Sequence, residues 1–99
     1  MSDTRLVCNL SALTPTERAR SLELLRELRA ATVERVELPD GYAFRYAAAA
    51  SLARVGEWIA LERQCCPFFH FQLDVAGDTD AVWLRLTGPA GIKSFLADV

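Results

Sequence analysis

Apolar residues recur at every second position in several short stretches, which is the period of a half-buried strand. In the first stretch Leu6, Cys8 and Leu10 share one side, so we expect Cys8 to face inward. Turn-forming residues arrange the later stretches as two hairpins, one around Pro39-Asp40-Gly41 and one around Gly77-Asp78. The strands predicted in this way are 5–10, 33–38, 42–46, 69–75 and 82–86.

Helical spacing predicts three helices between these strands. Thr14-Pro15-Thr16-Glu17 has the form of a capping box with proline at the first helical position, and the helix should run to about residue 31. Its expected apolar stripe is Leu22, Leu25 and Leu28, with Leu24 beside it. A second helix is predicted over 47–66, where Pro67 stops it, and a short third helix follows Gly88-Pro89.

The order of these elements defines the expected fold. It is β-α-β-β-α-β-β-α, and the short connections favour a mainly antiparallel sheet with the helices on one face, an α+β fold. At 99 residues with 52% hydrophobic composition, we expect a single domain over 1–99 with a core that needs neither disulfides nor metal.

The net charge and the N-terminal segment exclude some classes of partner from our expectation. Eleven basic and 13 acidic residues give a formal net charge of -2 without long runs of one sign, so we expect no nucleic-acid partner. The segment MSDTRLVCNL has neither the basic nor the apolar region of a signal peptide, and we expect no membrane partner and a cytoplasmic location. Three cysteines in a reducing compartment are typically free, metal-binding or redox-active.

The cluster with the clearest chemistry lies at the end of the second predicted helix. Leu52, Val55, Ile59, Glu62 and Cys66 follow a helical stripe, and a carboxylate on such a stripe is costly unless it is paired or coordinated. Cys65 and Cys66 come three and four residues after Glu62, so the three side chains should converge. Two thiolates suit a soft ion, and we expect zinc, copper(I) or mercury(II), with Glu62 as a ligand or as a base beside the metal and with Cys8 or His70 completing the site.

Each residue of this cluster also has a purely structural interpretation. Buried cysteines often act as small hydrophobic residues, and Glu62 could pair with Arg63, Arg85 or a backbone N–H. His70 is out of phase with its apolar neighbours, so it should lie at the surface. In this reading the chain is a structural or interaction domain, with Trp58 or Trp83 as packing residues or as the centre of a homodimer surface.

A thiol-dependent redox or demetallation enzyme is the third hypothesis. It uses the same residues but requires one exposed thiol with a lowered pKa. The C-terminal end of a helix carries partial negative charge and has the opposite effect on a thiol. A disulfide between the adjacent Cys65 and Cys66 is disfavoured, because it would strain the peptide between them.

Two elements of the sequence resemble a known family. Residues 62–68, ERQCCPF, and 83–89, WLRLTGP, resemble a family of short, mostly uncharacterised bacterial proteins that share an E-R-x-C-C-P-F and a W-L-R-L-T-G-P element. The resemblance extends over almost the whole chain, including the Leu38–Tyr42 hairpin turn. It implies an association with heavy-metal response and carries no catalytic assignment.

Overall fold

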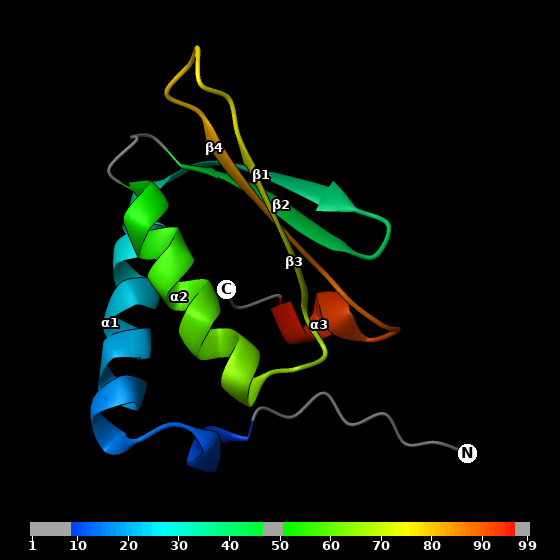
Figure 1. The fold of residues 1–99 in the computed structure, drawn as a ribbon. Coiled ribbons are helices and arrows are strands. Elements are labelled where there is room, and N and C mark those ends of the chain that lie inside the picture. Colours follow the sequence, from blue (N-terminus) through cyan, green and yellow to red (C-terminus); the bar gives the residue numbers. More distant parts are fainter. Residues whose placement is uncertain (1–8, 47–50, 97–99) are drawn as a thin grey trace.

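The computed structural model describes residues 9–46 and 51–96, which form three helices and a four-stranded antiparallel sheet (Figure 1). The elements are η1 (Leu10–Ala12, a 3-10 turn), α1 (Pro15–Ala31), β1 (Thr32–Leu38), β2 (Gly41–Tyr46), α2 (Ser51–Cys65), β3 (His70–Val75), β4 (Val82–Thr87) and α3 (Ile92–Leu96). The strand order is β1-β2-β4-β3, so each hairpin pairs its own strands and β2 pairs with β4. The predicted α+β class and antiparallel sheet are confirmed.

The predicted order of elements is wrong at its start, because the described order is α-β-β-α-β-β-α. Of the strand expected over 5–10, residues 5–8 lie outside the described residues, Asn9 is in no strand and residue 10 begins η1. Asn9 Oδ1 accepts hydrogen bonds from the backbone N–H of Ser11 at 3.2 Å and from its hydroxyl at 2.6 Å. An asparagine bonded to the backbone two residues on forms a turn, which competes with an extended strand.

The start of α1 follows its sequence signal. Thr14 Oγ1 accepts from the Glu17 backbone N–H at 3.1 Å, and Glu17 Oε1 accepts from the Thr14 N–H at 2.9 Å, which is the predicted capping box. Such a cap stabilises a helix by about 1 kcal/mol. The chain enters β1 directly after the helix, and Thr32 Oγ1 donates to the Leu28 carbonyl at 2.8 Å.

The end of α2 also lies close to its prediction. The helix was expected over 47–66; residues 47–50 lie outside the described residues, and the described helix begins at Ser51 and ends at Cys65. The Cys66 N–H still donates to the Glu62 carbonyl at 2.7 Å, so the last helical hydrogen bond reaches Cys66. Pro67 then stops the helix because it has no N–H to donate.

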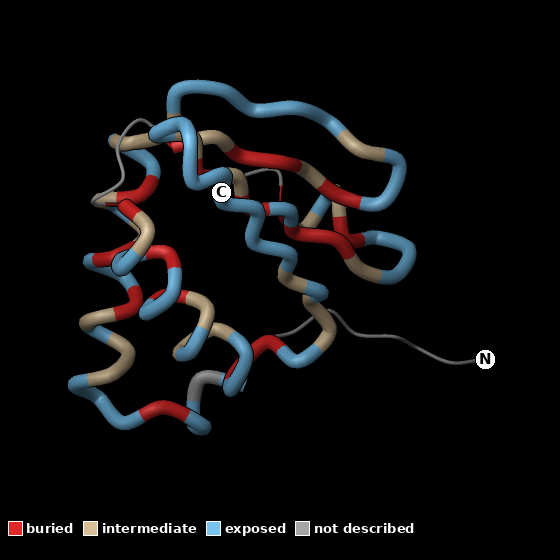
Figure 2. Tube along the Cα trace, turned by 45° about the horizontal axis from the view of Figure 1, so that its top comes forward, coloured by how far each residue is buried: buried red, intermediate tan, exposed pale blue. Residues whose placement is uncertain are grey.

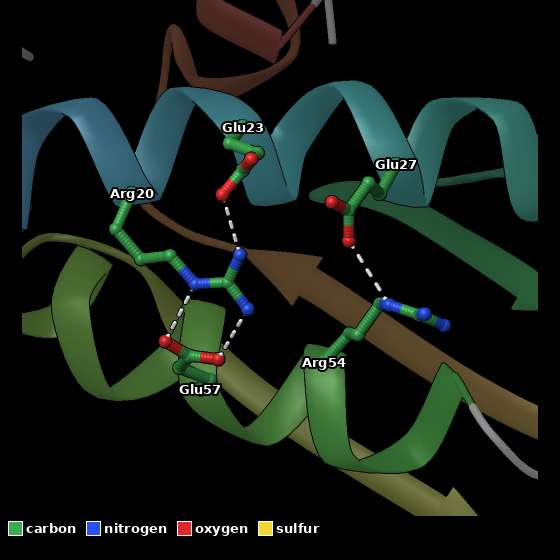
Figure 3. Close-up of polar contacts among 5 residues, drawn as sticks. All are labelled: Arg20, Glu23, Glu27, Arg54 and Glu57. Carbon is green, nitrogen blue, oxygen red and sulfur yellow. Dashed lines mark hydrogen bonds and ion pairs between the residues drawn. The ribbon is translucent and has the colours of Figure 1, made fainter.

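The two long helices run antiparallel and side by side, joined at their surface by ion pairs (Figures 1 and 3). The Arg20 guanidinium donates two hydrogen bonds of 2.8 Å to the Glu57 carboxylate across the helix pair and one of 2.6 Å to Glu23 on its own helix. Arg54 on α2 pairs with Glu27 on α1 at 2.9 Å. Because these side chains are exposed, each pair contributes little to the stability of the fold.

The hydrophobic core lies between the helices and one face of the sheet. The central strands β2 and β4 are largely buried and the edge strands β1 and β3 largely exposed (Figure 2). All three helices contribute to the same cluster, so they cover one sheet face, as predicted. Its buried members are Leu24, Leu28, Phe44, Tyr46, Val55, Trp58, Val82, Leu84, Leu86, Ile92 and Leu96.

The side of α1 that enters the core differs from the predicted stripe. Ser21, Leu24 and Leu28 are its buried residues, whereas Leu22 is 62% exposed. Leu24, which is fully buried, takes the central position, and the helix is therefore rotated by about one residue from the expected orientation. On α2, Trp58 is 4% exposed and lies in the core, so it is a packing residue.

Candidate metal centre

Glu62, Cys65 and Cys66 bring their ligand atoms together at the C-terminal end of α2. The two Sγ atoms lie 3.6 Å apart, Cys66 Sγ lies 3.5 Å from Glu62 Oε1, and Cys65 Sγ lies 3.9 Å from Glu62 Oε2. One ligand atom from each residue lies within 4.8 Å of the others. Residues three and four apart share a helix face, so the predicted convergence is confirmed.

Glu62 has a hydrogen-bond partner that the sequence pattern did not indicate. The hydroxyl of Ser21, a buried residue of α1, donates to Glu62 Oε2 at 3.0 Å. Arg63 and Arg85, the charged partners considered from the sequence, are both exposed. Ser21 lies three and seven positions before Leu24 and Leu28, on the same side of α1. A serine among the buried leucines of a helix needs a hydrogen-bond partner, and this is the sequence signal that could have suggested its contact with Glu62.

The sulfurs lie in an apolar environment. Cys65 and Cys66 are 1% and 0% exposed, and with Leu13 they form a second buried cluster beside the main core. Phe68 and Phe69 pack against this cluster and help to exclude water from the sulfurs. Glu62 is half-buried at its edge. A metal bound here would be largely shielded from water.

The electrostatics of the cluster favour the uncharged forms of its groups. Burial raises the pKa of Cys65, and the neighbouring Glu62 carboxylate raises it further. Burial also raises the pKa of Glu62, against the opposing effect of the hydrogen bonds from Ser21 and Cys65. A thiol that stays protonated at neutral pH is a poor nucleophile, so the described surroundings of Cys65 do not activate it.

We expect Glu62→Gln to stabilise the metal-free protein at neutral pH and to change it little in acid. The folded state raises the Glu62 pKa above the unfolded value. The stabilisation from this carboxyl is therefore present below the unfolded pKa and is lost as the pH rises through the folded pKa. Glutamine stays neutral and can still accept from Ser21. Urea midpoints of both proteins, measured from acid to neutral pH, test this difference.

Glu57→Gln is the matched control, because the Arg20 hydrogen bond lowers the pKa of Glu57. Stability from Glu57 is present above its unfolded pKa and is lost in acid, so this variant should show the opposite trend. If the urea midpoints of wild type and Glu62→Gln differed by the same amount at every pH, the expectation for Glu62 would be contradicted.

Cys8 and His70, the two other predicted ligands, are not part of the group formed by Glu62, Cys65 and Cys66 among the described residues. Cys8 lies outside the described residues, but the N–H of the next residue, Asn9, donates to the Cys65 carbonyl at 2.7 Å. His70 is exposed at the start of β3 and lies outside the group of close ligand atoms found among the described residues.

Cys65 has a free thiol, whereas Cys66 is disulfide-bonded, so the Cys66 sulfur can bind a metal only after reduction.

A pocket of about 210 Å³ opens beside the cluster, between α1 and α2. Cys65, Cys66 and Glu62 form part of its wall, together with leucines of both the α1 helix and the segment before it. Arg18 also lines it and donates to the Leu13 carbonyl at 3.1 Å. Leu22, which is 62% exposed, also lines this pocket.

Comparisons with protein-family models, with curated proteins and with solved structures find no match to this chain. Among the residues that the structure describes, no helix is both long and apolar enough to cross a membrane.

Proposed function

We propose that the reduced protein binds one zinc ion through Cys65, Cys66 and Glu62. The observation that carries this proposal is the set of separations between their ligand atoms. At a tetrahedral zinc with Zn–S bonds of about 2.3 Å and Zn–O bonds of about 2.1 Å, two sulfurs lie about 3.8 Å apart and a sulfur and an oxygen about 3.6 Å apart. Here the two sulfurs lie 3.6 Å apart, Cys66 Sγ lies 3.5 Å from Glu62 Oε1, and Cys65 Sγ lies 3.9 Å from the other carboxylate oxygen, Oε2. One carboxylate oxygen and both sulfurs lie within 4.8 Å of one another, so reduction of Cys66 and a small rotation of the carboxylate would bring the three ligands to zinc distances.

The same separations favour zinc over copper(I) or mercury(II) in linear coordination. A linear ion with bonds of about 2.3 Å would hold the two sulfurs about 4.6 Å apart. Cys65 and Cys66 are adjacent in the chain and lie 3.6 Å apart, so they would have to separate to bind such an ion. The resemblance to bacterial proteins associated with heavy-metal response is compatible with each of these metals.

Electrostatics support metal binding over a thiol-dependent enzyme. Burial and Glu62 raise the Cys65 pKa, and a thiol enzyme would need the reverse. A bound cation supplies the positive charge that keeps both sulfurs as thiolates. The structural interpretation explains the burial of the cysteines, but it gives no reason for a half-buried carboxylate within 4 Å of both sulfurs.

Cys8 is the candidate for the fourth position of the tetrahedron. It is covalently joined to the Asn9 nitrogen, which lies 2.7 Å from the Cys65 carbonyl oxygen. The residue that follows Cys8 in the sequence is thus bonded to the end of α2, which is the reason to prefer Cys8 as the fourth ligand. His70 remains an alternative, although its exposure at the start of β3 favours Cys8.

The proposal is tested by titrating the protein with zinc in a phosphine reductant that does not chelate the metal, against a chromophoric zinc indicator. We expect one zinc per chain by native mass spectrometry and slower alkylation of Cys65 when zinc is bound. Affinity should fall in acid, because protons compete for the thiolates.

The same titration without reductant provides the control. The Cys66 disulfide removes one sulfur from the site, so affinity should fall sharply. Zinc binding of equal strength in the reduced and oxidised proteins would refute the proposed site. A low thiol pKa in the alkylation profile would favour the enzyme hypothesis instead.

A further inference from the structure

The pocket beside the cysteines has a composition that a bare metal ion does not require. Leu13, Leu22 and Leu25 line it, while Cys65 and Cys66 form part of its wall. A zinc ion gains nothing from contact with leucine side chains. An organic group does gain, because its transfer from water to an apolar surface is favourable.

The pocket is large enough for a small aromatic ring. Its volume is about 210 Å³. A cavity of about 150 Å³ lined by leucine, isoleucine and phenylalanine is known to bind benzene. One of its lining residues, Leu22, is 62% exposed, so the pocket is bordered by the protein surface as well as by the buried cysteines.

The sulfur pair fits a trivalent element that carries such a group. Trivalent arsenic is pyramidal and holds its substituents near right angles, so two sulfurs bound to it stay close together. The 3.6 Å separation of the Cys65 and Cys66 sulfurs meets this requirement without the displacement that a linear ion needs. Soft thiolate ligands suit a soft acceptor.

We infer that the reduced protein binds monosubstituted trivalent arsenicals, R–As(OH)2, with arsenic bonded to Cys65 and Cys66 and the organic group R in the leucine-lined pocket. This inference rests on the proposed function, because it uses the same pair of reduced sulfurs. It adds the class of ligand for which the pocket is shaped.

The binding step balances without an oxidant or reductant. Two As–O bonds break and two As–S bonds form; each thiol proton leaves with a hydroxyl group as water, and arsenic remains trivalent. Both the reactants and the arsenic dithiolate are uncharged. A neutral product suits an apolar pocket better than a charged complex, since burying unpaired charge is costly.

The test compares phenylarsonous acid with arsenite, which lacks the organic group, and with zinc. Binding is measured on the reduced protein by native mass spectrometry and by competition with a small dithiol. Leu22→Asn places a neutral polar group in the pocket wall at an exposed site, where it should not affect folding. We expect it to weaken phenylarsonous binding by about 10-fold or more, and to leave arsenite and zinc affinities unchanged.

Leu73→Asn is the matched control, since Leu73 is an exposed leucine of β3 that does not line the pocket. It should change no affinity. If zinc and arsenite bind but Leu22→Asn affects all ligands equally, or none, the pocket does not select the organic group and the inference fails while the proposed function stands. If none of the three ligands binds, both fail.

Discussion

Replacing Cys66 with serine is expected to lower zinc affinity by at least about 100-fold while the protein still folds. A hydroxyl is a hard, essentially un-ionised ligand and cannot replace a thiolate on zinc. Loss of a group that only supports a metal ligand already costs about 10- to 100-fold, so loss of a ligand itself should cost more. Indicator competition on the reduced proteins measures this change.

The same variant separates the metal hypothesis from the structural one. If Cys66 were only a packing residue, serine would place a polar hydroxyl in a fully buried site, at a cost of about 1 to 3 kcal/mol in unfolding free energy. Both proteins are unfolded with reductant present, so that loss of the Cys66 disulfide does not contribute to the difference. Ala43→Ser, a buried substitution in β2, is the control, because it should cost stability and leave zinc affinity unchanged. A Cys66→Ser protein that loses stability but binds zinc like wild type would reject the metal site.

Gly41→Ala is expected to destabilise the fold by about 3 kcal/mol or more, and so to lower the melting temperature by about 10 °C or more. Gly41 opens β2 and faces Thr87 in β4. A Cβ atom at this position would lie 1.9 Å from the backbone oxygen of Leu86. Because that neighbour is backbone, it cannot rotate away, and the two central strands would have to separate locally.

Gly56→Ala provides the matched control for this effect. Gly56 lies on the exposed side of α2, and a Cβ there would meet no atom within 4 Å. Alanine is the better helix former, so this variant should gain up to about 1 kcal/mol. Equal melting temperatures for Gly41→Ala and wild type would show that the sheet tolerates the side chain and would contradict the close approach of β2 and β4.

The elements that the sequence predicted correctly are those set by local chemistry. Thr14 and Glu17 form the capping box within four residues, and Pro67 ends α2 because of its own missing N–H. The strand expected at the start of the chain failed for a different reason. Alternation over 5–10 is a valid strand signal, but Asn9 bonds to Ser11 and to Cys65, and the second contact spans more than fifty residues.

In the candidate site, too, the contacts within one helix could be predicted from the sequence and the contacts between helices could not. Glu62, Cys65 and Cys66 lie within one helical turn, so their convergence followed from spacing alone. Ser21 could not be identified, because its contact with Glu62 depends on how α1 is rotated against α2. That rotation was mispredicted at Leu22 for the same reason: both Leu24 and Leu25 could have faced the core, and only packing against the sheet decides between them.

The pairing of β2 with β4 has a consequence for how the chain acquires its structure. The β1–β2 and β3–β4 hairpins each close a short loop, whereas β2 meets β4 only when Tyr46 comes opposite Val82, with all of α2 between them. Contacts between residues distant in sequence form more slowly than local ones, because more chain entropy is lost before they are made. The two hairpins should therefore form early as separate units, and the folding rate should depend on how fast the central strands find one another. Glu62, Cys65 and Cys66 can converge as soon as α2 forms, whereas the burial of the two cysteines against Leu13, Phe68 and Phe69 should be completed only in that last, slow step.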